Sequence, residues 1–432
     1  MDDFVEGRRA DFADATRVFA SIGVLSFGGP AAQIALMHRK LVDENGWLTE
    51  RQFLNALGFC TLLPGPEAMQ LATYGGWRLH GVLGGLMAGA LFVLPGATVI
   101  AALAALYVTY GSVPAVAALF TGIQAAVLVV VIEALVKVSK RALQSADRWA
   151  VAALAFVALF FFDFPFPLVV LGAGLYGFFA QRDATQEVAT VPHSKGDSKG
   201  GAFDSLKGAL AGLVVWLLPL VVVEAITDTQ LLAQVWWFFS KLAVVTFGGA
   251  YAVLAYMAQE VVADLGWLSA KQMMDGLGLA ETTPGPLILV TEFVAFVAGY
   301  KQGGMGLAFA AAAMALWVTF VPCFIWIFAG APHLDRLSAM PRLTGALSAI
   351  TAAVVGVMLN LSLWFGLHVI FGEVSRTSFG PAQLWWPANP VPDFEVLALV
   401  FLAAVLLLGK RVNLVSVLTA CALVSLLFAL VG

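Results

Sequence analysis

The chain has 432 residues, of which 61% are hydrophobic and 12% are charged, and its formal net charge is −4. This charged share is about half that of an ordinary soluble domain. A chain of this length has too little polar surface to cover so much apolar material in water, so lipid must serve as solvent. The negative charge argues against nucleic acid as a partner. The three cysteines Cys60, Cys323 and Cys421 match no metal or redox spacing, so neither a cofactor nor a metal is predicted.

Nine apolar runs are candidate membrane spans. They cover residues 82–110, 113–136, 149–162, 168–180, 208–226, 306–329, 343–370, 396–408 and 412–430. Several are short enough to require a tilted helix or a locally thinner bilayer. None alternates polar and apolar residues as the wall of a β-barrel would. The sequence therefore predicts an all-α polytopic membrane protein.

The sequence contains two related halves. Ser26-Phe27-Gly28-Gly29 recurs as Thr246-Phe247-Gly248-Gly249, Trp47-Leu48-Thr49 as Trp267-Leu268-Ser269, and Pro64-Gly65-Pro66 as Pro284-Gly285-Pro286. All three pairs share an offset of 220 residues, which indicates a tandem duplication. We therefore expect a first repeat at 1–180, a polar cytoplasmic linker at 181–207, and a second repeat at 208–432 that begins with an extra span.

The distribution of basic residues predicts that the repeats face opposite ways. The loop after the span 113–136 carries Lys137, Lys140, Arg141 and Arg148, and is expected to be cytoplasmic. Its counterpart, 371–395, has one basic residue, Arg376, against three acidic ones, and is expected to be external. Three spans, at 149–162, 168–180 and 208–226, separate the matching segments of the first half from those of the second, and an odd number inverts the second copy. This inverted-repeat plan is typical of secondary transporters, whose substrate site lies between the halves near mid-membrane.

Two apolar segments in each half are interrupted by glycine and proline. Gly28-Gly29-Pro30 interrupts residues 18–37, and Pro64-Gly65-Pro66 separates residues 53–63 from 67–77. Proline breaks a helix interior, and glycine allows close approach of the backbone. These breaks predict discontinuous half-helices whose amino-terminal ends meet near mid-membrane and bind an anion. The alternative is that the glycines only allow close helix packing. Breaks at corresponding places in both halves favour the anion site.

Polar residues in these segments are candidates for substrate binding and proton transfer. Glu67, Gln70, Tyr74 and Arg78 are spaced to share one helix face. Glu67 is either a helix cap or a proton carrier, and Arg78 is either an anion partner or a side chain that extends to the interface. The predicted substrate-binding residues are Ser26, Phe27, Gly28, Gly29, Pro64, Gly65, Gln70, Tyr74, Arg78, Thr246, Gly248, Gly249, Thr282, Thr283 and Gly285. The predicted proton-coupling residues are Glu67, Glu281 and Glu292.

At these same motifs the sequence resembles the chromate ion transporter family in its long, two-domain form. The resemblance is carried by Ser26-Phe27-Gly28-Gly29-Pro30-Ala31, by Leu62-Leu63-Pro64-Gly65-Pro66-Glu67-Ala68, and by their counterparts at 246–251 and 282–286, and it extends over residues 15–430. It implies a secondary active transporter of the bacterial inner membrane, not an enzyme. Such a protein exports chromate from the cytoplasm, coupled to the proton motive force, and confers chromate resistance. The expected partners are chromate, sulfate as a competitor, protons, membrane lipid and a second copy of the chain in a homodimer. The amino terminus is expected to be cytoplasmic.

Two alternatives remain open from the sequence. One is a permease for sulfate or another anion that carries chromate incidentally. The other is an intramembrane enzyme or a protein that handles lipid phosphates, since a cradle of half-helices would also suit a lipid phosphate. No catalytic dyad or metal cluster in the sequence supports the enzyme.

Overall fold

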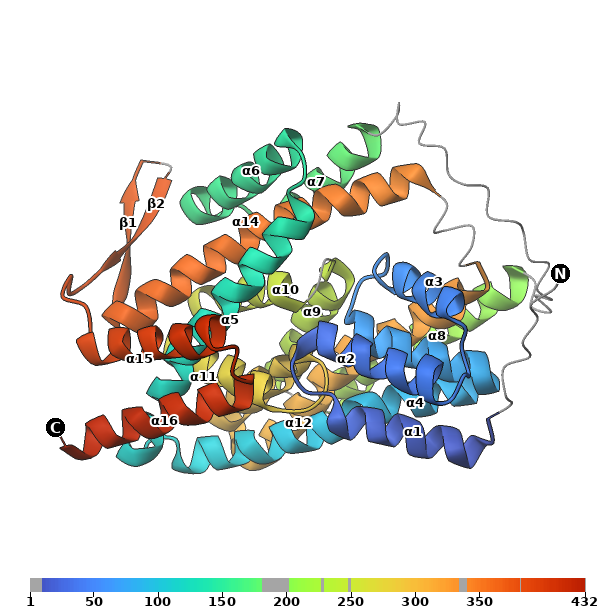
Figure 1. The fold of residues 1–432 in the computed structure, drawn as a ribbon, viewed down its shortest axis with the longest axis horizontal. Helices are drawn as coiled ribbons and strands as arrows, with labels where there is room; N and C mark the ends of the chain where they lie inside the picture. The colour runs from blue at the N-terminus through green and yellow to red at the C-terminus, as the bar shows by residue number, and fades with distance from the viewer. Residues whose placement is uncertain are drawn as a thin grey trace.

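The computed structural model describes residues 10–180, 202–226, 229–247, 250–333, 340–380 and 382–431, and these are mostly helical (Figure 1). The first half contains α1 (Phe12–Leu25), α2 (Gly29–His38), the π-helical turn η1 (Arg39–Glu44), α3 (Glu50–Cys60), α4 (Glu67–Tyr110), α5 (Pro114–Ala142), α6 (Ala146–Phe162) and α7 (Phe166–Ala180). After α8 (Ala202–Ile226) follow α9 (Gln230–Val245), α10 (Ala250–Gln259), η3 (Glu260–Asp264), α11 (Ala270–Thr282), η4 (Leu287–Leu289), α12 (Val290–Gly330), η5 (Ala331–His333), α14 (Pro341–Phe371), α15 (Phe394–Ala404), η6 (Val405–Gly409) and α16 (Leu414–Val431).

The order of helices α1 to α5 returns in α9 to α14. In both halves a short helix pair ends in a π-helical turn, and the next helix begins with a capping box. The box pairs Thr49 with Gln52 in α3 and Ser269 with Gln272 in α11, and it satisfies two backbone donors at each helix start. The same local signals, 220 residues apart, therefore produce the same order of elements.

The long helices α4 and α12 are each broken near one end. The backbone departs from helical geometry at His80 and Gly81 in α4, and at Gly303 and Gly304 in α12. Gly81 and Gly304 have φ values of 63° and 74°, which glycine adopts without the clash that a Cβ would cause. Each long helix therefore consists of a short half-helix after the Pro-Gly-Pro loop and a longer part that can cross a membrane.

Among the described residues, five helical segments are long and apolar enough to cross a membrane, and each of the nine predicted apolar runs lies mostly in a helix. The five are 67–110, 114–142, 287–330, 341–371 and 414–431. Helix α8 exposes large apolar side chains, including Val214 at 65% and Val221 at 63%, as expected of a helix in contact with lipid. The prediction of a helical membrane protein is confirmed for the described residues.

The two halves complete each other's helix packing. Helix α14 packs against α6 and α7, and α5 packs against α15 and α16, so each half supplies the partner helices of the other (Figure 1). Small residues allow these close approaches. A Cβ added at Gly122 in α5 would lie 2.2 Å from the Cys421 carbonyl oxygen in α16, and one at Gly177 in α7 would lie 2.2 Å from the Gly345 carbonyl oxygen in α14.

Two details differ from the sequence prediction. An antiparallel hairpin, β1 (Val374–Phe379) with β2 (Ala382–Pro387), follows α14, so the all-α prediction is wrong for this segment. Arg376 pairs with Trp385 across the strands, with its guanidinium carbon 4.5 Å from the ring centroid, and this cation–π pair stabilises the hairpin. Helix α8 begins at Ala202, inside the predicted linker 181–207, and residues 181–201 lie outside the described residues.

Gly122→Ala should destabilise the protein, because the added methyl group would force α5 away from the α16 backbone. Overpacking of this kind costs about 1–3 kcal/mol. The measurement is the melting temperature of the purified protein in detergent. Gly172→Ala in α7 is the matched control, since no heavy atom lies within 4 Å of its added Cβ. An unchanged melting temperature for Gly122→Ala would contradict this packing.

Candidate functional site

Loops that interrupt the helices of the two halves meet in pairs. The Gly65 amide donates to the Thr246 carbonyl oxygen, and the Gly285 amide donates to the Ser26 carbonyl oxygen, both at 2.9 Å. Gly285 is the repeat counterpart of Gly65, and Thr246 is the repeat counterpart of Ser26, so the two bonds correspond to each other. The Pro-Gly-Pro loop of each half is therefore hydrogen-bonded to the Phe-Gly-Gly segment of the other. We call residues 26–29, 64–66, 246–247 and 284–286 the crossing loops.

Glycine is required at the centre of both Pro-Gly-Pro loops. Gly65 has φ 117° and Gly285 has φ 90°. A Cβ at Gly65 would lie 2.8 Å from Cys323 Sγ on α12 and 2.9 Å from Gln70 Nε2. On the other side, a Cβ at Gly96 of α4 would lie 2.1 Å from the Pro284 carbonyl oxygen. Each loop thus lies against the long helix of the opposite half.

Two buried glutamines support these loops. Gln33 on α2, 1% exposed, donates from Nε2 to the Gly285 carbonyl oxygen at 2.7 Å and to the Ser26 carbonyl oxygen at 3.3 Å. Gln70, fully buried in α4, donates to the Pro64 carbonyl oxygen at 2.7 Å, and its Oε1 has no hydrogen-bond partner among the described residues. Gln33 was not among the predicted site residues. A single amide within an apolar helix was the available signal.

The half-helices of the first half present uncapped amino-terminal ends. Helix α2 begins at Gly29 and α4 begins at Glu67, and no side chain caps either start. Gly28 and Gly29 have φ values of 86° and 79°, and the next helical positions after Pro30 are exposed. The first N–H groups and the positive end of the helix dipole favour an anion at such sites. In the second half, Gly248 and Gly249 lie outside the described residues.

The predicted hydroxyl ligands are occupied within their own helices. Ser26 donates to the Ile22 carbonyl oxygen, and Thr246 donates to that of Leu242. The hydroxyls of Thr282 and Thr283 likewise donate to carbonyl oxygens of α11. An oxyanion requires donors, and each hydroxyl has only one proton to donate. Backbone N–H groups are therefore better placed than these hydroxyls to hold an anion in this conformation.

The predicted polar face of α4 extends away from the crossing loops. Tyr74 is 9% exposed and lies beside Trp77, with ring centroids 5.8 Å apart. Arg78 is exposed, two residues before the break at His80, and about 16 Å along the helix from Glu67 at 1.5 Å per residue. The structure thus does not bring Arg78 to the crossing loops. Phe27 is 41% exposed.

The three predicted proton-coupling acids lie close in sequence to the crossing loops. Glu67 is the first residue of α4 and is half-buried. Glu281 in α11 is 7% exposed, and Glu292 in α12 is 2% exposed. Glu292 Oε2 has no hydrogen-bond partner among the described residues. Acids inside a membrane protein are costly and usually functional. In the described part of the chain, no three His, Cys, Asp or Glu residues are grouped to hold a metal ion.

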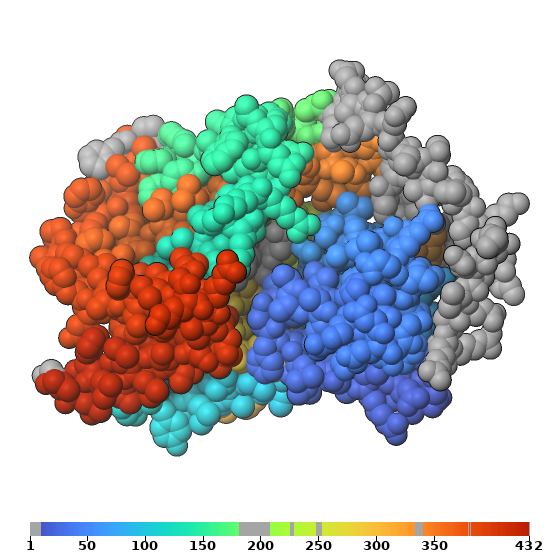
Figure 2. All heavy atoms as spheres, viewed as in Figure 1, coloured from blue at the N-terminus to red at the C-terminus, as the bar shows by residue number. Residues whose placement is uncertain are grey.

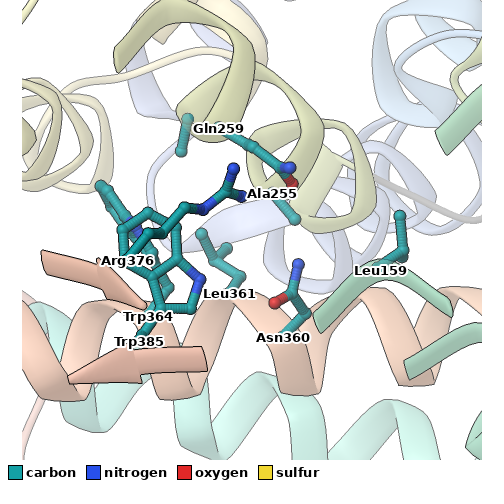
Figure 3. A pocket seen from close by; sticks show the side chains of 9 residues that line it. Leu159, Ala255, Gln259, Asn360, Leu361, Trp364, Arg376 and Trp385 are labelled. Carbon is teal, nitrogen blue, oxygen red and sulfur yellow. The ribbon is translucent and has the colours of Figure 1, made fainter. Parts of the chain in front are cut away.

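A pocket away from the crossing loops lies beside the hairpin (Figure 3). Its lining includes Gln259 of α10, Asn360 of α14 and Arg376 of β1. The Arg376 guanidinium binds both carboxylate oxygens of Asp163 at 3.0 Å, and Gln259 also donates to Asp163. Bidentate pairs of this kind fix geometry, so the cluster holds the hairpin to the end of α6.

Comparison with known sequences decides the family. The chromate transporter family model matches residues 13–178 and 233–426. The chain belongs to the chromate transporter family. Each of the two stretches of the chain that match the family model contains a Phe-Gly-Gly segment and a Pro-Gly-Pro loop. The hydrogen bonds of the crossing loops therefore connect one matched stretch to the other.

Relatives in this family align over most of the chain. A "Probable chromate transport protein" of Synechococcus elongatus is 28% identical over 404 residues, covering 91% of this chain and 95% of the relative. A "Chromate transport protein" of Pseudomonas aeruginosa is 33% identical over 346 residues, covering 79% and 77%. Another, of Cupriavidus metallidurans, is 29% identical over 341 residues, covering 78% of each. No solved structure matches the chain.

Gly65→Ala should lower the melting temperature of the purified protein, because alanine at φ 117° strains the backbone and its Cβ meets Cys323 and Gln70. Backbone strain alone costs on the order of 1–3 kcal/mol. Gly58→Ala is the control, since α3 offers open space at that position. Adding Cys323→Ala to Gly65→Ala should restore part of the loss. Equal melting temperatures for Gly65→Ala and Gly58→Ala would show that the loop is not constrained in this way.

Proposed function

We propose that the chain is a secondary active transporter that exports chromate across the bacterial inner membrane, uses the proton motive force and confers chromate resistance. The observation that carries the proposal is the meeting of helix breaks from the two halves, bonded through Gly65 and Gly285, beside the uncapped starts of α2 and α4. Helix amino termini suit a tetrahedral divalent oxyanion. Relatives named as chromate transport proteins support chromate as that anion.

In this proposal residues 1–180 and 208–432 are two repeats in opposite orientations. Helix α6 begins two residues before Arg148 and is followed by Asp163, which binds Arg376. The 17 residues of α6 span about 25 Å, so Arg148 and Arg376 lie at opposite ends of this helix. With the basic loop 137–148 in the cytoplasm, the hairpin lies outside. The hairpin belongs to residues 371–395, the counterpart of the basic loop in the second repeat.

The anion is held by backbone N–H groups at Gly28 and Gly29 and at their counterparts Gly248 and Gly249. Gly65 and Gly285, whose amides donate to Thr246 and Ser26, shape the site. Glu67, with Glu281 or Glu292, carries the proton. A divalent anion beside an ionised carboxylate in a low dielectric is strongly unfavourable. The acid near the cradle is therefore protonated when the anion is bound and ionised when the anion has left. The proton and the divalent anion then cross together with a net negative charge, which the inside-negative membrane potential drives outward.

The decisive experiment is uptake of labelled chromate into inverted membrane vesicles that contain the protein. Energised vesicles should accumulate chromate, and a protonophore should abolish the accumulation. Vesicles without the protein are the control. Excess sulfate tests selectivity: partial competition fits a chromate transporter, whereas faster uptake of labelled sulfate identifies a sulfate permease. No uptake of either anion would overturn the proposal.

Cysteines at Gln144, in the basic loop, and at Ser378, in the hairpin, should react with a membrane-impermeant maleimide from opposite sides. Both positions are exposed, and the three native cysteines are buried and should give little background. Intact cells should label Ser378→Cys alone, and inverted vesicles should label Gln144→Cys alone. Labelling of both from one side would rule out opposite orientations.

Glu67→Gln should bind chromate as well as or better than the parent, because the neutral amide does not repel the anion, and it should lose transport driven by a pH gradient. Binding is measured by equilibrium dialysis and transport in the vesicle assay. Glu133→Gln is the control, since Glu133 pairs with Lys137 on α5 at 2.6 Å, away from the crossing loops. Normal transport by Glu67→Gln with an unchanged pH profile would mean that Glu67 is only a helix cap.

A further inference from the structure

A buried carboxylate outside the predicted site joins the second half to the first. Asp275 on α11 is 2% exposed. Its two oxygens accept hydrogen bonds from the Tyr107 hydroxyl on α4 at 2.7 Å and from Gln124 Nε2 on α5 at 2.6 Å. Both donors are neutral, and no ion pair to Asp275 occurs among the described residues. The arrangement satisfies an ionised carboxylate through two hydrogen bonds alone.

The helices around Asp275 are in close contact. A Cβ at Gly278 would lie 2.3 Å from Ile123 Cγ2 on α5. The Tyr107 ring is fixed edge-on between Phe120 and Phe293, with centroids 5.1 and 5.2 Å away. Hydrogen bonds to a charged group are stronger than neutral ones, and leaving the carboxylate unsatisfied would be costly. The three side chains therefore hold α11 against α4 and α5.

The repeat counterpart of this contact is not formed. Asn55 on α3 lies 220 residues before Asp275, and it is exposed, as is Leu54 at 52%. By contrast, residues 273–281 of α11 are all buried. Helices α10 and α11 pack against α14 and α5, whereas α2 and α3 form no extensive contact with either in the described structure. A furrow separates the blue amino-terminal residues from the teal and red residues on one face (Figure 2).

We propose that Asp275 is a positioning residue for transport, which with Tyr107 and Gln124 forms a latch that holds the second-half side of the site shut, and that the latch releases when Asp275 is protonated. The inference rests on the proposed function for its place in a transport cycle. Protonation of Asp275 removes the negative charge that strengthens both hydrogen bonds and places an O–H donor on one of the two acceptor oxygens. The latch therefore weakens as the pH falls.

Few other charged groups lie on the elements packed against α11. Helix α11 itself carries Lys271 and Glu281. Helix α12 contributes Glu292 and Lys301, and Lys301 donates to Gln272 Oε1 of α11 at 2.6 Å. The charged residues of α4 and its His80 lie in its first 14 positions, before the break, whereas Tyr107 is near its end. The charged residues of α5 lie in its last ten positions, those of α14 are Arg342 and His368 near its ends, and α16 has none. Tyr107 is the one titratable group in hydrogen-bond contact with Asp275 among the described residues.

The test is the rate at which a cysteine behind the latch reacts with N-ethylmaleimide in the purified full-length protein. Leu279→Cys places a thiol one helical turn after Asp275, at a position that is 7% exposed. Tyr107→Phe and Gln124→Met, which keep side-chain shape and remove one donor each, should raise the rate about tenfold, equivalent to about 1.4 kcal/mol. Because the thiolate is the reactive form, each rate is divided by the rate for N-acetylcysteine at the same pH. In the parent this relative rate should rise as the pH falls. Asp275→Asn should raise the rate and abolish this pH dependence.

Ser362→Ala is the control, because it removes a buried hydroxyl that donates to the Met358 carbonyl oxygen within α14. It should leave the rate at the parent value. Gel filtration and melting temperature show whether each variant is folded, and if Asp275→Asn is not, Tyr107→Phe decides the test. An unchanged rate in folded Tyr107→Phe and Gln124→Met, or the parent's pH dependence retained in folded Asp275→Asn, would overturn the latch. Labelling needs no anion, so its failure is distinct from a failure of chromate uptake, which would overturn only the proposed function.

Discussion

Two backbone hydrogen bonds between the halves, from Gly65 to Thr246 and from Gly285 to Ser26, set the constraint on which the rest of the structure depends. In a bilayer no water is available for backbone groups freed by a helix break, so protein must satisfy them. Each half breaks its helices where the other half supplies the partner. These bonds therefore hold the halves together. Beside them, no side chain caps the starts of α2 and α4, and an uncapped helix start suits an anion.

The long helices form a frame in which the halves are interlocked, while the short helices differ between the halves. Helix α5 packs against α15 and α16 of the second half, and α14 packs against α6 and α7 of the first half. Within this frame, α11 is bonded to α4 and α5 through Asp275, whereas α3 leaves Asn55 exposed at the corresponding position. One sequence plan, used twice, thus gives two unequal environments. Alternating access requires such a difference, because a site shut on both sides or open on both sides cannot move an anion against its gradient.

The candidate site was predictable in its location and less so in its chemistry. The glycine and proline breaks marked the crossing loops, because these residues act on the local backbone. The hydroxyls of Ser26 and Thr246 were predicted as ligands, yet they donate to their own helices. Arg78 shares a helix face with Glu67 in the sequence, but it lies two residues before the break at His80, at the far end of a half-helix. Side-chain partners of this kind depend on neighbours distant in sequence.

The sequence by itself determined the membrane class, the helical spans, the duplication and the positions of the helix breaks. Each of these follows from local properties, namely apolar length, glycine and proline conformation, and motifs at a fixed offset. Only the tertiary structure decided which loops cross, that α5 and α14 exchange partners between the halves, and that Asp275 meets Tyr107 and Gln124. These contacts join residues more than 150 positions apart, and they depend on how closely small residues allow helices to approach. The hairpin at 374–387 also depends on such contacts, since Arg376 is held by Asp163 at the end of α6.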